Sequence, residues 1–253
     1  MPSGLISRLI PHLIDFMKKS DIIVLGVVII TLFPFFIFPQ VLNGYKELNA
    51  AHGYAMSFSK FAILATFGEC LGLRIRQGIY NKKGFGLIPR AIVWGFLGIT
   101  IKVAFVIFGE GAPMILKTIG VHFPYAHPAD VLRQPGFSGL KLLAAFSVSM
   151  TMNLLFAPVF MASHRVTDMH IQRTGGTLKG FLTIIPVGKY IKEIDWFSFW
   201  DFVVKKTIPV FWIPAQTINF LFPEDYRIFI AAIYSVILGV LLSLASLMQG
   251  RKP

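Results

Sequence analysis

Charged and amide side chains interrupt several long apolar stretches of this sequence. They are Lys60, Glu69, Lys102, Asn153, Gln216 and Asn219. A charge at the centre of a bilayer costs about 2.5–3.5 kcal/mol on insertion scales, so each one needs a partner, a route to the interface or a function. The chemistry open to this set is hydrogen bonding and the selection of ions along a polar pathway.

Each of these residues also has a purely structural interpretation. Lys60 and Lys102 fall at similar depth in neighbouring antiparallel segments. There they would form a cationic ring, or extend their long side chains to the membrane surface. Glu69 would line a pathway, or pair with Arg74 or Arg76 in its own helix. The amides would line a pathway, or join helices at about 0.6 kcal/mol each.

The histidines do not follow a metal-binding pattern. His164 and Asp168 are four residues apart and would share a helix face, whereas His170 points elsewhere. His122 and His127 lie in a proline-containing loop. The chain lacks an H-E-x-x-H pair, a G-x-S-x-G serine motif and a phosphate-binding lysine motif. We therefore expect no metal, no cofactor and no enzymatic activity, unless a histidine meets acids in space.

The composition places these residues in a membrane protein. Of 253 residues, 55% are hydrophobic and 14% are charged, against about 25% charged in an average soluble domain. A single cysteine, Cys70, excludes a disulfide framework. The net charge of +12 is spread between apolar runs, so the expected partner is the lipid bilayer and not a nucleic acid.

Six apolar segments approach the length of about 20 residues that a membrane-crossing helix needs. They are 22–41, 55–73, 89–108, 140–162, 207–222 and 228–248. The fifth is short and contains Pro209 and Pro214, which remove backbone donors and kink a helix. Residues 1–21 carry apolar side chains at helical spacing and predict an amphipathic helix on the membrane surface. The expected fold is an all-α polytopic transmembrane helix bundle, with a single domain over 22–253.

The basic residues indicate the orientation of these segments. Seventeen of the 24 Lys and Arg residues lie on one side of the six segments, five lie on the other, and Lys60 and Lys102 lie within segments. This asymmetry predicts six crossings with both termini in the cytoplasm or an equivalent compartment. Five crossings would place Arg251 and Lys252 on the opposite side.

The last fifty residues carry a spaced pattern of polar and aromatic residues. The pattern reads FWIPAQTINFLFPEDYR and is followed by a final segment ending in LLSLAS. It resembles the Mpv-seventeen/peroxisomal membrane protein twenty-two family, whose C-terminal pattern is W-P-x-x-Q-x-x-N-F-x-x-V-P-x-x-x-R and then a span closing in Y-L-S. The residues that carry the resemblance are Trp212, Gln216, Asn219, Phe220, Pro223, Arg227 and Ser243.

The resemblance weakens away from this segment. Pro214 lies one place later than the family proline, and Met152–Asn153 stand where the family has Asp-Gln. The similar region runs over about 55–247, whereas residues 1–54 have no counterpart. Four crossings are usually drawn for the family, so this chain adds to them.

The resemblance implies a pore-like protein of a peroxisomal or mitochondrial inner membrane, and a prokaryotic plasma membrane is the alternative location. We expect an integral membrane channel or transporter for small solutes, with a preference for anions because Lys60 and Lys102 lie at one depth. The alternative function is a structural or scaffold protein without transport. A homo-oligomer is compatible with both.

Arg227 is expected to have a structural role. It follows the tight Pro223–Glu224–Asp225 turn and can cap the carbonyls that end the fifth segment. Gln216 and Asn219 are three residues apart, so they share one helix face, which we expect to turn inward.

Overall fold

The computed structural model describes residues 18–249, which form helices joined by loops and contain no β-strand. The all-α prediction is confirmed for this part of the chain. The chain separates into two compact units, one ending at Ala51 and the other beginning at His52. This boundary falls inside the single domain expected over 22–253. Most of the expected surface helix, residues 1–17, lies outside the described residues.

The first unit contains α2 (Lys19–Ile37) and α3 (Pro39–Ala51). The expected first segment, 22–41, is divided between them at Phe38, whose backbone is extended. The cause is local, because a residue that precedes a proline is disfavoured in the helical region. α2 alone remains long and apolar enough to cross a membrane.

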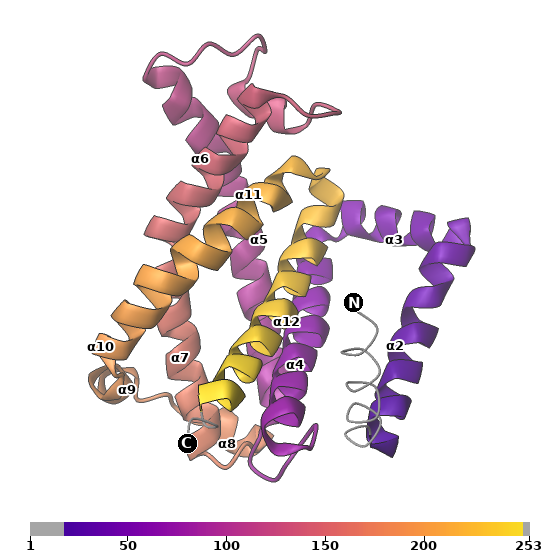
Figure 1. The fold of residues 1–253 in the computed structure, drawn as a ribbon, viewed down its shortest axis with the longest axis vertical. Helices are drawn as coiled ribbons and strands as arrows, with labels where there is room; N and C mark the ends of the chain where they lie inside the picture. Colours follow the sequence, from indigo (N-terminus) through magenta and orange to yellow (C-terminus); the bar gives the residue numbers. More distant parts are fainter. Residues whose placement is uncertain (1–17, 250–253) are drawn as a thin grey trace, which may run out of the picture. The chain divides into compact units, whose positions relative to one another are not determined.

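The second unit is a helix bundle with long helices and short connecting helices (Figure 1). Its elements in chain order are α4 (Gly53–Gln77), α5 (Leu87–Thr118), η1 (Pro128–Leu132), α6 (Gly139–Leu155), α7 (Ala157–Arg173), α8 (Leu178–Phe181), α9 (Val187–Glu193), α10 (Trp196–Ser198), the π-helix η2 (Phe199–Trp212), α11 (Ile213–Leu221) and α12 (Glu224–Gln249). α4 packs against both α5 and α12, and α6 packs against α5 and α11.

Within the described residues, four helices are long and apolar enough to cross a membrane, namely α2, α4, α5 and α12. α6 and α7 make a fifth crossing if they are one span, bent by 47° at Phe156. Pro158, at the start of α7, lacks the N–H that would continue the helical hydrogen bonds across the bend. η2 and α11, which cover the expected fifth segment, are not among these helices.

Glycines bring α4 close to both of its neighbours. A Cβ on Gly98 of α5 would lie 2.6 Å from the carbonyl oxygen of Ser57 in α4. On the other side, a Cβ on Gly72 of α4 would lie 2.8 Å from Ser243 Oγ of α12. Small residues at such positions let helix backbones approach closely, which is how membrane helices gain packing energy.

Candidate functional site

A polar cavity with a volume of about 550 Å³ lies among α4, α5, α7, η2 and α12. We call it the Arg90 cavity. Its polar and charged lining residues are Glu69, Arg76, Arg90, Trp94, His164, Arg165, Asp168, Gln172, Trp212, Ser235 and Ser243.

Arg90 joins three helices at this cavity. Its guanidinium, on α5, forms an ion pair through Nη1 with Glu69 Oε2 of α4. Through Nη2 it pairs with Asp168 Oδ1 of α7 at 2.5 Å. Its Nε donates to the Phe85 carbonyl at 2.7 Å. The Arg90 side chain is 9% exposed, so these contacts replace water around a charge that the bilayer would otherwise strongly disfavour.

The second oxygen of Glu69 lies beside an aromatic pair. Trp94 Nε1 donates to Glu69 Oε1 at 2.8 Å, and His164 Nε2 lies 3.7 Å from the same oxygen. The rings of Trp94 and His164 are 4.4 Å apart, centroid to centroid. Glu69 therefore contacts a cation, an indole and an imidazole at the wall of the cavity.

Sequence reasoning located Glu69 but missed its surroundings. The ion-pair partner of Glu69 is Arg90 of the next helix, α5. Arg76, which was expected as a partner, donates to Ser243 Oγ at 2.8 Å instead. His164 and Asp168 do share a helix face, as expected, and both line this cavity. Their four-residue spacing was a local signal for the site, in addition to Glu69 itself. In the described part of the chain, no group of three His, Cys, Asp or Glu side chains could hold a metal ion.

A narrower space, the Asn153 cavity, continues from the Arg90 cavity. It has a volume of about 50 Å³ and includes Asn153 and Gln216 in its lining. The residues that line both cavities are Ile101, Phe160, Met161 and Trp212. Asn153, buried in α6, donates to the Ser149 carbonyl at 2.8 Å. Two of the amides predicted from sequence therefore do meet in one cavity.

Asn219 is placed differently. It is fully buried and donates to Gln216 Oε1 at 2.9 Å and to the Arg227 carbonyl at 3.0 Å. It does not line any of the cavities described here. Its inward orientation is as expected, and its contacts join α11 to the start of α12.

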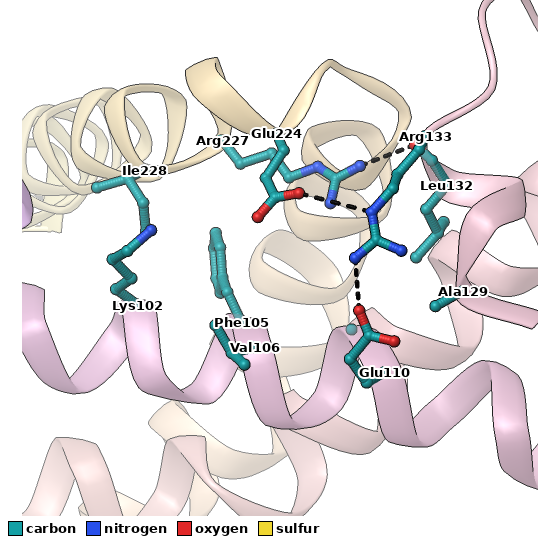
Figure 2. A pocket seen from close by; sticks show the side chains of 11 residues that line it. Lys102, Phe105, Val106, Glu110, Ala129, Leu132, Arg133, Glu224, Arg227 and Ile228 are labelled. Atoms are coloured by element: carbon teal, nitrogen blue, oxygen red, sulfur yellow. Dashed lines mark hydrogen bonds and ion pairs between the residues drawn. The ribbon is translucent and has the colours of Figure 1, made fainter. Parts of the chain in front are cut away.

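A third space, the Arg227 cavity, lies at the end of the bundle where α11 turns into α12 (Figure 2). Its volume is about 130 Å³. The charged residues that line it are Lys102, Glu110, Arg133, Glu224 and Arg227. Phe105 lines both this cavity and the Asn153 cavity, and its ring packs against Phe220 at 4.9 Å.

Arg227 caps the end of α11, as the sequence predicted. Its Nε donates to the Phe222 carbonyl at 3.0 Å, and its Nη2 lies 3.3 Å from the Phe220 carbonyl. The same Nη2 donates to the Leu132 carbonyl of η1 at 2.9 Å. That third bond connects the turn to a loop distant in sequence, so no local pattern could have predicted it.

Arg133 and its carboxylates hold the η1 loop against the bundle. Arg133 Nη2 donates to Glu110 Oε1 at 2.6 Å, and Nη1 donates to Asp130 Oδ1 at 3.0 Å. Its Nε lies 3.8 Å from Glu224 Oε2 of α12. The hydrogen bond to Glu110 raises the pKa of Arg133 above its usual value, so this residue stays charged at any physiological pH. Sequence reasoning missed both Arg133 and Glu110.

The two lysines predicted to share one depth interact electrostatically. Lys60 is 7% exposed and does not line the Arg227 cavity, whereas Lys102 does.

The family-pattern residues also lie near the cavities. Trp212 lines both the Arg90 cavity and the Asn153 cavity, Pro214 lies in the first turn of α11, and Pro223 precedes α12.

Replacing Arg227 with alanine should lower the free energy of unfolding by about 2 kcal/mol. The variant leaves the carbonyls of Phe220 and Leu132 without their donor, and a hydrogen bond to a charged group contributes about 1.5–3 kcal/mol. Folded yield and melting temperature in detergent measure the effect, with Lys82→Ala as the exposed control. Unchanged melting combined with altered solute selectivity would instead assign Arg227 to a transport role alone.

The chain was also compared with known proteins. No protein-family model matches it, and no match is found among curated proteins or among solved structures.

Proposed function

We propose that the second unit is a membrane channel or transporter for small solutes. The observation that carries this proposal is the row of three spaces within one bundle. The Arg90 cavity and the Asn153 cavity share four lining residues, and Phe105 lines both the Asn153 cavity and the Arg227 cavity. Charged side chains line the two end cavities, and amides line the space between them.

The charges favour anions as solutes. Three cationic side chains and two carboxylates line the Arg227 cavity, and the Arg90 cavity has the same balance when histidine is neutral. Lys60 adds a further buried cation near Lys102. An excess of one sign of charge in a narrow, low-dielectric space raises the local concentration of the opposite ion.

Six crossings remain part of the proposal. The bent pair α6–α7 would be the fourth crossing and η2–α11 the fifth, with α12 returning the chain to the starting side. The Ser149 hydroxyl of α6 donates to the Ile213 carbonyl at 2.7 Å. A partner of this kind lets a proline-interrupted segment lie at membrane depth, because irregular backbone is tolerated there when protein surrounds it.

Membership of the Mpv-seventeen/peroxisomal membrane protein twenty-two family belongs to the same proposal and rests on the C-terminal pattern.

The residue that lines both the Asn153 cavity and the Arg227 cavity is the one to test. Phe105 is 8% exposed, packs on the fully buried Phe220 and lines both the Asn153 cavity and the Arg227 cavity. We interpret this arrangement as a closed state of the pathway.

Replacing Phe105 with alanine should increase solute flux several-fold, because it removes the ring that lines both cavities. The measurement is efflux of chloride, acetate and inorganic phosphate from proteoliposomes that contain the purified full chain. The control is Phe146→Ala, which removes a partly exposed ring of α6. Equal flux from the wild-type and Phe105→Ala proteins, at the level of protein-free liposomes, would contradict transport and favour the scaffold alternative.

The scaffold alternative has its own support in the structure. Asn219 of α11 donates to the Arg227 carbonyl of α12, and the Ser149 hydroxyl of α6 donates to the Ile213 carbonyl of α11. These contacts would hold helices together without any solute. The polar cavities at both ends of the bundle have no function in that interpretation, and for this reason we place transport first.

A further inference from the structure

The ammonium group of Lys102 is the starting point for a more specific inference. In the part of the chain that the structure describes, it makes no hydrogen bond or ion pair, and it lies 5.7 Å from the centroid of the Tyr54 ring. Figure 2 shows the Lys102 side chain extending from α5 toward α12 at the Arg227 cavity. A cation in the middle of an apolar helix without a counter-charge is costly, so an anion at this position would stabilise it.

Arg227 offers a second donor at the same cavity. Its three recorded hydrogen bonds use Nε and Nη2. The remaining nitrogen, Nη1, donates to no group among residues 18–249. Because those three bonds fix the guanidinium plane, the free Nη1 is held in a defined place beside the cavity. Arg227 can therefore cap α11 and contact an anion at the same time.

The carboxylates of the cavity are engaged elsewhere. Glu110 contacts Arg133 at 2.6 Å and His127 Nδ1 at 3.4 Å. Glu224, at the rim, is 60% exposed and faces Arg133. Two other charges lie nearby. The ammonium group of Lys60 repels that of Lys102, and the carboxylate of Asp225 attracts the ammonium group of Lys60. Among the described residues that line this cavity, Lys102 and Arg227 are thus the cations that form no ion pair with a carboxylate, and Glu224 acts on Arg227 only from beyond ion-pair distance.

The size and walls of the cavity limit the ligand. A volume of about 130 Å³ corresponds to about four water molecules at roughly 30 Å³ each. Phosphate or a short carboxylate such as acetate fits that space, and a nucleotide does not. Phe105, Val106 and Ile228 supply apolar walls, and a low dielectric constant strengthens the attraction between the anion and its two cations.

We propose that the Arg227 cavity binds a small oxyanion, a phosphate or a short-chain carboxylate, between Lys102 and Arg227. This inference rests on the proposed function, because the cavity would be the place where a transported anion binds within the pathway. The ligand group has two sources, a free anion or the phosphate of a lipid headgroup, and the experiment separates them.

The test uses the full chain in phosphatidylcholine nanodiscs, titrated calorimetrically with inorganic phosphate and with acetate. We expect saturable binding that Lys102→Gln weakens about tenfold or more, since one charge-assisted contact is lost. Lys102→Arg should retain it. Lys117→Gln, which removes an exposed lysine of the same helix, should leave it unchanged. Comparable melting temperatures of the four proteins show that the variants fold.

The lipid source is tested by including phosphatidylglycerol in the nanodiscs. If this lipid abolishes phosphate binding and is retained on the wild-type protein but not on Lys102→Gln, the headgroup is the ligand. If phosphate still binds, the ligand is a free anion. Absence of phosphate and acetate binding, without lysine-dependent lipid retention, would overturn the site, as would equal affinity of wild type and Lys102→Gln.

The outcomes also separate this site from transport itself. Flux without Lys102-dependent binding would overturn the oxyanion site and leave the proposed function standing. Binding without flux would leave the site and overturn transport.

Discussion

Replacing Arg90 with alanine is expected to lower the free energy of unfolding by about 3–5 kcal/mol, the cost of removing one partner from a buried ion pair. The variant would leave the carboxylates of Glu69 and Asp168 in the interior without the cation that separates them. It would also leave the Phe85 carbonyl without its donor. The expected result is little folded protein in detergent extracts, measured by size-exclusion chromatography and thermal melting.

Two comparisons separate this effect from the loss of a basic residue in general. Arg165→Ala removes a 56% exposed guanidinium that lies 3.5 Å from Asp168 and should change stability by less than about 1 kcal/mol. The triple variant Arg90→Met, Glu69→Gln and Asp168→Asn removes the charges together and should recover much of the folded yield. An Arg90→Ala protein that melts like wild type would show that the three-helix ion pair contributes nothing to stability.

Replacing Gly98 with leucine is the second change with a large expected effect. A Cβ there would lie 2.6 Å from the Ser57 carbonyl oxygen and 2.7 Å from Phe61 Cβ. The first of these atoms belongs to the backbone, so no side-chain rotation relieves the clash and α5 would have to move away from α4. Overpacking typically costs about 1–3 kcal/mol, and we expect a loss at or above the top of that range.

Gly111→Leu is the matched control for this substitution. It lies in the same helix, and a Cβ there meets no atom within 4 Å. Because leucine is a better helix former than glycine, this variant should be neutral or stabilising by up to about 1 kcal/mol. The melting temperatures of both variants in detergent provide the comparison. Equal melting of the Gly98 and Gly111 variants would mean that α4 and α5 do not depend on their close approach.

The sequence predicted the long apolar helices because their signal is local. The segments 55–73, 89–108 and 228–248 correspond to α4, α5 and α12. Length and hydropathy alone identify such helices. The same measures could not place the break at Phe156 or the change from π-helix to α-helix at Ile213. These features depend on where single prolines lie and on which helices pack beside them.

The candidate site was only partly predictable for a related reason. Arg227 and its capping of α11 could be inferred, because the turn brings the residue and the carbonyls together within a few positions. Glu69 could be identified as a charge in an apolar helix, but its partners come from α5 and α7. Periodicity shows that a helix has a polar position and does not show which other helix faces it. Pairing of this kind emerges only from the packed bundle.

The ion pairs of Arg90 also have a consequence for synthesis of the protein. A chain that enters a membrane from its N-terminus presents α4 before α5, so the carboxylate of Glu69 is already in place when the guanidinium arrives. The two helices can then enter the bilayer as a hairpin in which one charge neutralises the other, which lowers the cost of insertion. Asp168 belongs to the much later α7 and joins a pair that already exists. The order of the residues along the chain thus lets Glu69, Arg90 and Asp168 meet as the bundle is assembled.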